Sequence, residues 1–183
     1  MSRLSIPATI EAAPVASQPM LEAVKKKLGL APNLFRLVAT SPAALEGLLG
    51  LSGGLAKGSI SAATGERIAL AVSEIDGCDY CLSAHTYVAK NLAKLDDAEI
   101  TANRSGASND LEADAAVRFA AKVARERGHV SEADVSAVKL AGYDDAQVIE
   151  IVLHVALTTL TNYVNEVAKT DIDFPVVNTR KTA

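Results

Sequence analysis

Residues 65–85 read GERIALAVSEIDGCDYCLSAH, and this stretch is the one from which the rest of the chain is best understood. It contains Cys78 and Cys81, the two cysteines of the 183-residue chain, in a C-x-x-C arrangement. His85 follows the second cysteine by four residues, and Glu66 precedes the first by twelve. Two cysteines placed one helical turn apart, with none elsewhere, indicate a dithiol that is kept for chemistry.

The pattern around the cysteines is helical. Apolar residues with i, i+3, i+4, i+7 spacing predict an amphipathic helix that begins near residue 61: Ile68, Ala71, Val72 and Ile75. Asp76 and Gly77 should end this helix. We expect Asp76 to cap a second helix that begins at Cys78 and continues to about Leu95.

Outward from this stretch, helix-start signals recur. Ser41 with Pro42 predicts a helix that runs to about residue 57. Three further pairs have the spacing of capping boxes: Asn109 with Glu112, Ser131 with Asp134, and Asp144 with Gln147. The longest apolar helix should run from Asp145 to about Lys169, with five inward residues: Val148, Ile151, Val152, Val155 and Val164.

No hairpin pattern of alternating apolar residues occurs, and no proline falls between Pro42 and Pro175. The sequence therefore predicts an all-α fold with a single domain. We place this domain at residues 20–176, between an extended N-terminal arm (1–19) and a C-terminal tail (177–183). The region before the tail also includes Phe174, which we expect to cover a hydrophobic surface.

Composition narrows the function. The net charge is −4 with acidic and basic residues intermixed, so we expect neither nucleic acid nor a membrane surface as a partner. No apolar run approaches the ~18 residues of a membrane span, and Pro7, Glu11 and Pro14 interrupt any secretory signal. We therefore expect a cytoplasmic protein. Apolar residues make up 49% of the chain but aromatic residues only 4%, which indicates closely packed helices and homo-oligomerisation.

The spacing of the motif suits thiol chemistry. Residues three apart on a helix are close enough for a reversible disulfide between Cys78 and Cys81. A helix start favours a thiolate, more so at Cys78, whereas proton removal by His85 acts more on Cys81. Glu66 could orient His85 if the two helices fold back on each other. The residues alone leave open which cysteine attacks.

The pattern E-x11-C-x-x-C-x3-H resembles the core motif of the AhpD-like alkylhydroperoxidases in the carboxymuconolactone decarboxylase superfamily. Residues 31–35 (APNLF) before it, and the region from Asn162 through residues 170–175 (TDIDFP) after it, are similar to its peroxidase-related branch. This resemblance implies an all-helical AhpD-like bundle, homo-oligomeric assembly, and thiol peroxidase or disulfide reductase activity. It also implies that no metal, haem or other cofactor is used.

Carried onto this chain, the resemblance implies that Cys81 attacks the hydroperoxide and that Cys78 resolves the product. Glu66 and His85 would form a proton relay. An external dithiol would be the reductant, and we expect it to attack at Cys78, as the more exposed of the two cysteines.

Two residues depart from the family pattern. The best-studied members carry histidine just before the second cysteine, where this chain has Tyr80, and a basic residue is common before the glutamate, where this chain has Gly65. We expect Tyr80 to line a substrate entrance.

Other functions remain open at this point. A structural zinc site could use Cys78, Cys81 and His85 with either His129 or His154. A non-catalytic redox sensor, a thioredoxin fold, and a decarboxylase or hydrolase of the same superfamily are further alternatives. The histidines outside the motif have simpler interpretations: His129 should be exposed, and His154 should be a hydrogen-bonded core residue.

Overall fold

The structure is a computed structural model and describes residues 2–180. Within this range the regular elements are a 3-10 helix, η1 (Val15–Ser17), and nine α-helices: α1 (Gln18–Leu28), α2 (Asn33–Val38), α3 (Pro42–Leu55), α4 (Ala62–Asp76), α5 (Asp79–Asn91), α6 (Asp97–Arg104), α7 (Leu111–Glu126), α8 (Glu132–Leu140) and α9 (Asp145–Ala168). The described residues contain no strand, which confirms the all-α prediction. Met1 of the predicted arm and residues 181–183 of the predicted tail lie outside the described range.

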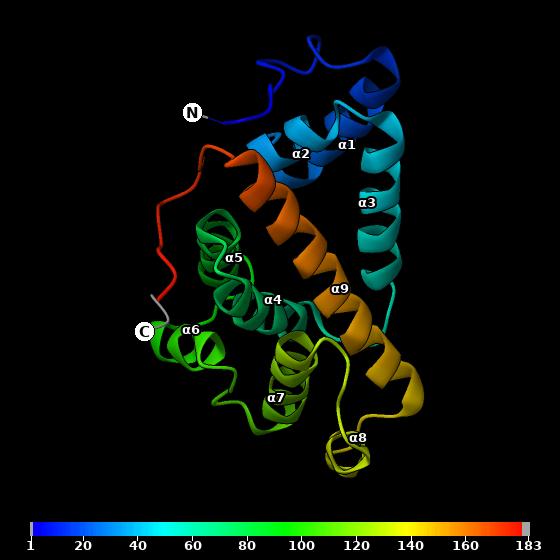
Figure 1. The fold of residues 1–183 in the computed structure, drawn as a ribbon, viewed down its shortest axis with the longest axis vertical. Coiled ribbons are helices and arrows are strands. Elements are labelled where there is room, and N and C mark those ends of the chain that lie inside the picture. The colour runs from blue at the N-terminus through cyan, green and yellow to red at the C-terminus, as the bar shows by residue number, and fades with distance from the viewer. Residues whose placement is uncertain (1, 181–183) are drawn as a thin grey trace.

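The core is built around α4. This helix packs against α5, α6, α7 and α9, and most of its residues are buried. In Figure 1, α9 crosses the molecule beside α4, with α1, α2 and α3 toward one end and α7 and α8 toward the other. One layer of buried aliphatic side chains joins α4, α7 and α9, including Ile68, Val117 and Ile151. A motif on α4 and α5 is therefore held by most of the bundle.

The turn between α4 and α5 is sharp because Gly77 has a φ of 73°, a left-handed conformation that glycine adopts without strain. The predicted break is confirmed, but its cap is different. Asp76 is the last residue of α4, and Cys78 caps α5, since its Sγ accepts a hydrogen bond from the Cys81 amide at 3.2 Å. A thiol thus occupies the place where a carboxylate was expected.

Two of the three predicted capping pairs are confirmed as reciprocal capping boxes, at Ser131 with Asp134 and at Asp144 with Gln147. The third prediction is wrong by one residue, because Asp110 accepts the first amides of α7. The second motif helix also ends sooner than expected, at residue 91, and the short helices α2 and α6 were not predicted. Helices of six and eight residues are too short to show a clear apolar period.

The helix α9 has two different faces. Ile151 and Val155 are buried as predicted, but Val152 is 37% exposed and points away from the core. It belongs to an outward apolar stripe along the helix, which also includes Ile149, Leu153, Leu160, Tyr163 and Val167. By length and composition alone α9 could span a membrane. Its inner face, however, carries buried asparagine and threonine side chains and packs on α4.

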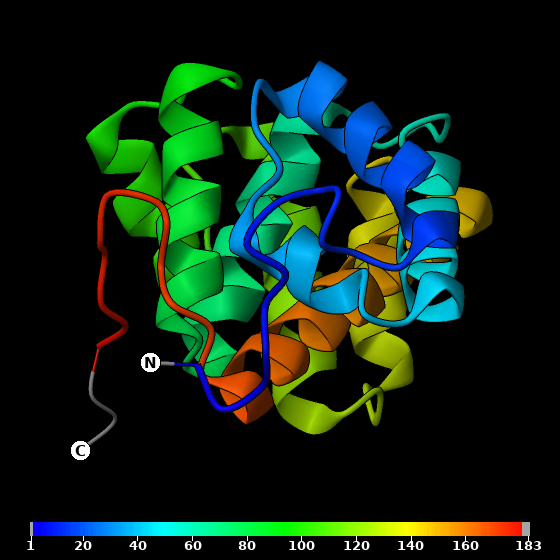
Figure 2. The ribbon, with the colours of Figure 1, turned by 90° about the horizontal axis from the view of Figure 1, so that it is seen from above.

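The segment after α9 runs back along α5, as Figure 2 shows from above. Three backbone amides fix it there: Val177 donates to Ser83 Oγ at 2.9 Å, Thr179 to Asp79 Oδ1 at 2.7 Å, and Arg180 to Glu74 Oε1 at 2.6 Å. The described end of the chain is therefore attached to both motif helices.

Candidate active site

The two cysteines lie at the start of α5 and are free thiols. Cys78 is fully buried, and Cys81 is 2% exposed. Around them is an apolar cluster that draws on α2, α5, α9 and the C-terminal segment: Leu34, Val38, Tyr80, Ala84, Val164, Ile172 and Phe174. The dithiol is thus held inside the fold, beneath the chain's own C-terminal segment.

The two thiols differ in acidity. Hydrogen bonding from the Cys78 thiol lowers the pKa of Cys81, and His85 and the Asn165 amide lower it further, against the opposing effect of burial. The same sulfur–sulfur hydrogen bond, together with burial, raises the pKa of Cys78. The helix start was expected to act more on Cys78. Instead Cys81 is the cysteine whose thiolate is favoured, because its sulfur receives side-chain hydrogen bonds from the Cys78 thiol and the Asn165 amide.

Glu66 and His85 face each other across the α4–α5 turn. His85 Nδ1 lies 2.8 Å from Glu66 Oε2, and both side chains are about one quarter exposed. Burial lowers the pKa of His85, but the charge and hydrogen bond of Glu66, with a contribution from Cys81, outweigh it and leave the pKa raised. The structure therefore brings together four of the residues singled out from the sequence, Cys78, Cys81, His85 and Glu66.

Two further residues reach the dithiol from α9 and were missed by the sequence reasoning. Asn165 donates from Nδ2 to Cys81 Sγ at 3.2 Å, and Thr161 Oγ1 lies 4.0 Å from the same sulfur. Both are buried. A signal was present in the sequence, since polar residues at 158, 161, 162 and 165 share one face of an otherwise apolar helix. Buried polar side chains at such positions require specific partners.

Tyr80 is buried at 3% exposure and ties three segments together. Its hydroxyl accepts from the Leu34 amide at 3.0 Å and donates to Asp173 Oδ1 at 2.8 Å. Its ring makes an edge-to-face contact with Phe174, with centroids 5.9 Å apart. Burial raises the pKa of Tyr80, so the hydroxyl keeps its proton for the bond to Asp173. In this structure Tyr80 is part of a closed cover over the dithiol, and its role at an entrance stays a prediction.

The other histidines lie outside this cluster. His129 is exposed, as expected. The ring of His154 packs on Gly65, where an added Cβ would come within 2.9 Å of Cε1. Its Nε2 is buried without a hydrogen-bond partner among the described residues, and burial lowers its pKa. The expected hydrogen bond to this core histidine is therefore not found at Nε2.

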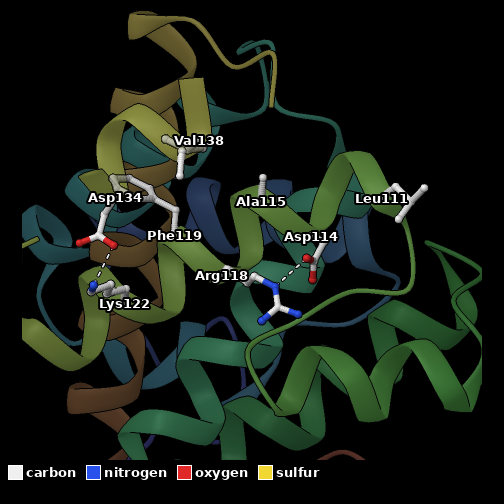
Figure 3. Close-up of a pocket in the computed structure, with 9 residues that line it drawn as sticks. Leu111, Asp114, Ala115, Arg118, Phe119, Lys122, Asp134 and Val138 are labelled. Atoms are coloured by element: carbon white, nitrogen blue, oxygen red, sulfur yellow. Dashed lines mark hydrogen bonds and ion pairs between the residues drawn. The ribbon is translucent and has the colours of Figure 1, made fainter. Parts of the chain in front are cut away.

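Within residues 2–180 no three His, Cys, Asp or Glu side chains gather into a group that could hold a metal ion, so nothing in this range supports the zinc alternative. A surface groove of about 370 Å³ lies between α7 and α8 (Figure 3). Its charged residues are paired with each other, Arg118 with Asp114 at 2.6 Å and Lys122 with Asp134 at 2.7 Å. No residue of the dithiol cluster lines it.

Comparison with known structures gives close matches in fold. An uncharacterised peroxidase-related protein from Silicibacter sp. TM1040 is 25% identical, with 93% of this chain and 91% of that chain covered and a TM-score of 0.81. A protein from Ralstonia eutropha JMP134, described as an alkylhydroperoxidase AhpD core and uncharacterised peroxidase-related protein, is 25% identical, with coverages of 94% and 92% and a TM-score of 0.82.

A third structure, of the debrominase Bmp8, is 22% identical, with 92% and 91% covered and a TM-score of 0.77, and shares the fold. Comparison with curated proteins gave no match. The model of the carboxymuconolactone decarboxylase family matches residues 42–126, a range that contains the whole motif from Glu66 to His85. Together with the two AhpD-related structures, this match supports an AhpD-like member of the carboxymuconolactone decarboxylase superfamily.

Proposed function

We propose that this protein is a thiol peroxidase that reduces a hydroperoxide through the Cys78–Cys81 dithiol. The proposal rests on the environment of the Cys81 sulfur. Its thiolate is favoured, a second thiol lies one helical turn away, and His85, bound to Glu66, is near enough that the charges of His85 and Cys81 shift each other's pKa. The family match and the peroxidase-related neighbours support the same function.

In the proposed first step the Cys81 thiolate attacks the terminal oxygen of the hydroperoxide, and the O–O bond breaks. Cys81 becomes a sulfenic acid, and the alkoxide that leaves takes a proton from His85, whose charge Glu66 stabilises. With hydrogen peroxide the leaving group becomes water. The sulfur is oxidised by two electrons and the peroxide is reduced by two.

In the second step the Cys78 sulfur gives up its proton and attacks the sulfenic acid, which forms the disulfide and releases water. An external dithiol then reduces the disulfide by two exchanges and is itself oxidised. Cys78 was expected to be the more exposed partner for this exchange. That expectation is wrong, because Cys78 is 0% and Cys81 2% exposed.

The apolar lining of the dithiol favours a second candidate, reductive debromination. Phe174, Tyr80 and Ile172 would suit an aromatic halide better than hydrogen peroxide. A thiolate can attack bromine as it attacks oxygen: the C–Br bond breaks, Cys81 carries the bromine, and the carbanion takes a proton. Cys78 then displaces bromide to give the disulfide. The debrominase Bmp8, of which a cysteine-to-alanine variant is known in complex with 2,3,4-tribromopyrrole, shares this fold at 21% identity.

One experiment separates these candidates. Purified protein is given tert-butyl hydroperoxide, hydrogen peroxide or tribromopyrrole, each with dithiothreitol, dihydrolipoamide or reduced thioredoxin as donor. Peroxide loss and bromide release are followed, with Cys81→Ser as the matched control. We expect catalytic loss of hydroperoxide that disappears in the control. Bromide release without peroxide loss would favour the second candidate, and neither activity would favour a redox sensor.

The proposal includes homo-oligomerisation through the outward stripe of α9. Six apolar side chains, between 37% and 65% exposed, lie along that helix, and exposed apolar surfaces of this kind mark interfaces. Tyr163→Asp should lower the molecular mass measured by light scattering to that of a single chain. Leu140→Asp, at an exposed apolar residue on α8, is the control and should leave the mass unchanged. A wild-type mass of one chain would exclude this assembly.

A further inference from the structure

We propose that Asn165 is a catalytic residue of this site, an inference that rests on the peroxidase function proposed above. Its side-chain amide would hold the Cys81 thiolate with the N–H group and the O–H of the incoming hydroperoxide with the carbonyl oxygen. Asn165 lies 84 residues from Cys81 in the chain, and it is brought to the sulfur by the packing of α9 against α5.

The donor half of this proposal, in which the N–H group holds the thiolate, rests on the contact between the Asn165 amide and the sulfur. Asn165 Nδ2 lies 3.2 Å from Cys81 Sγ, a short distance for a hydrogen bond to sulfur, and Asn165 is 2% exposed. A hydrogen bond to a charged acceptor is stronger than one to a neutral acceptor, more so away from water. The amide therefore stabilises the thiolate relative to the thiol, which agrees with its lowering of the pKa of Cys81.

The acceptor half of the proposal, in which the carbonyl oxygen holds the hydroperoxide, rests on Oδ1 of the same amide. Asn165 Oδ1 is buried and has no hydrogen-bond partner among the described residues. Buried amide oxygens are nearly always paired, because leaving one unpaired destabilises the fold. Oδ1 and Nδ2 belong to one small planar group, so this unpaired acceptor is part of the same amide that contacts the sulfur. A ligand with a donor group at that place would complete the pairing.

A hydroperoxide supplies that donor. Its terminal oxygen, the one that the thiolate attacks, carries the O–H proton. If this O–H donates to Oδ1, the attacked oxygen is held next to Cys81 Sγ in the position that reaction needs. The O–O bond then breaks as described above, and the O–H bond stays intact in the sulfenic acid. The inference therefore predicts that the site reduces peroxides with a free O–H group and does not reduce dialkyl peroxides.

The donor half is tested by titration of the thiolate, followed by its ultraviolet absorbance as a function of pH. Asn165→Ala should raise the midpoint for Cys81 by about one to two pH units. Asn165→Asp, which keeps the shape of the side chain but adds a like charge, should raise it at least as much. Asn162→Ala is the matched control. Asn162 is a buried asparagine on the same helix, but its amide donates to Asp76 at 2.7 Å and does not contact the sulfur.

The acceptor half is tested by turnover. For Asn165→Ala, kcat/KM with tert-butyl hydroperoxide should fall about tenfold to hundredfold, and part of this loss should persist at a pH where the variant's thiolate is fully formed. Di-tert-butyl peroxide should not be consumed by the wild type. If substitution destabilises the fold, ¹⁵N-labelled wild-type protein still tests the donor half, because the side-chain amide of Asn165 should shift with the Cys81 titration.

The outcomes separate this inference from the function on which it rests. An active wild type with an Asn165→Ala variant that keeps both the wild-type midpoint and the wild-type kcat/KM would overturn the inference alone. A wild type that consumes no hydroperoxide with any donor would overturn the proposed function and the substrate half together. A raised midpoint in Asn165→Ala, with Asn162→Ala unchanged, supports the donor half in either case.

Discussion

Two side-chain pairs, each containing one glutamate, begin at neighbouring residues of α4, Glu66 and Arg67, and their carboxylates lie in different environments. Glu66 turns toward α5 and meets His85 at 2.8 Å, whereas Arg67 turns toward α6 and meets Glu99 at 2.6 Å. Successive residues of a helix point about 100° apart, so one turn of α4 can serve two sites. Each pair joins a glutamate to a cationic or ionisable partner, yet only the first lies beside the dithiol.

The difference is in how completely each carboxylate is satisfied. Glu99 is 6% exposed and accepts hydrogen bonds from four groups: Arg67 Nε, Asn103 Nδ2, Ser108 Oγ and the Asn109 amide. Burial would raise its pKa, but these bonds outweigh burial and lower it to about 2. Glu66 is partly exposed and meets a histidine whose own pKa is raised. A carboxylate with every acceptor filled is structural, and one with a single titratable partner can help to move a proton.

The largest expected effect comes from breaking the first pair. Glu66→Gln keeps the shape of the side chain but removes the charge that stabilises protonated His85. We expect kcat/KM for hydroperoxide to fall by about 10²-fold or more, as for the loss of a general acid, with little change in the urea midpoint of unfolding. A variant with full activity would show that Glu66 takes no part in the reaction.

Breaking the second pair should do the reverse. Glu99→Gln leaves Arg67 buried without its main partner, and we expect the free energy of unfolding to fall by about 3 kcal/mol. Activity per folded molecule should remain within about twofold, because Glu99 lies on α6 away from the sulfurs. Urea denaturation and steady-state assays on the same preparation measure both quantities. If Glu99→Gln lost as much activity as Glu66→Gln, the assignment of Glu99 to a purely structural role would be wrong.

Lowering the pH should remove the stabilisation that the pair of Glu99 and Arg67 gives to the fold. The pKa of Glu99 is about 2 in the fold and near 4.5 in the unfolded chain. Its stabilisation is therefore complete above about pH 4.5 and is lost as the pH falls toward 2. The difference in unfolding free energy between wild type and Glu99→Gln should narrow over that window. A difference that is constant with pH would place the effect outside this carboxylate.

The smallest effect should be a shift in the alkaline limb of activity. In the proposed mechanism protonated His85 gives its proton to the leaving alkoxide, so activity should fall as the pH rises through the His85 pKa. Glu66 raises this pKa. The residual activity of Glu66→Gln should therefore decline at lower pH than that of wild type, in a profile of kcat/KM against pH. If the alkaline limb of Glu66→Gln stays at the pH of the wild-type limb, the decline in activity would be due to the titration of another group.

Much of this site could be predicted because its central residues lie within one contiguous stretch. Glu66, His85 and both cysteines are joined by two helices and a glycine turn, and the spacing of the stretch fixes their relative placement. Asn165 and Asp173 could not be placed in the same way, because they reach the site through tertiary packing of α9 and the segment after it. Local pattern carries no information about which distant helix meets a given side chain.

The errors in the fold have similar physical causes. Cys78 replaces Asp76 as the cap of α5 because the left-handed Gly77 separates the two helices, which moves the cap by two residues and the helix start from Cys78 to Asp79. The apolar pattern of this long helix predicts Val152 inward, whereas the residue belongs to the outward stripe. Whether an apolar face meets its own chain or another one is decided by assembly, and a single sequence does not contain that information.

The cover over the dithiol has a consequence for the two halves of the catalytic cycle. Tyr80, Asp173 and Phe174 close over sulfurs that are almost fully buried. A peroxide is a few atoms across and needs only a narrow gap, whereas a protein or lipoyl-type donor must bring its own sulfur into line with the disulfide. In the proposed cycle the oxidative half-reaction would thus proceed through small fluctuations, while the reductive half-reaction would require the cover to lift. The contacts of one tyrosine would then set the pace of recycling.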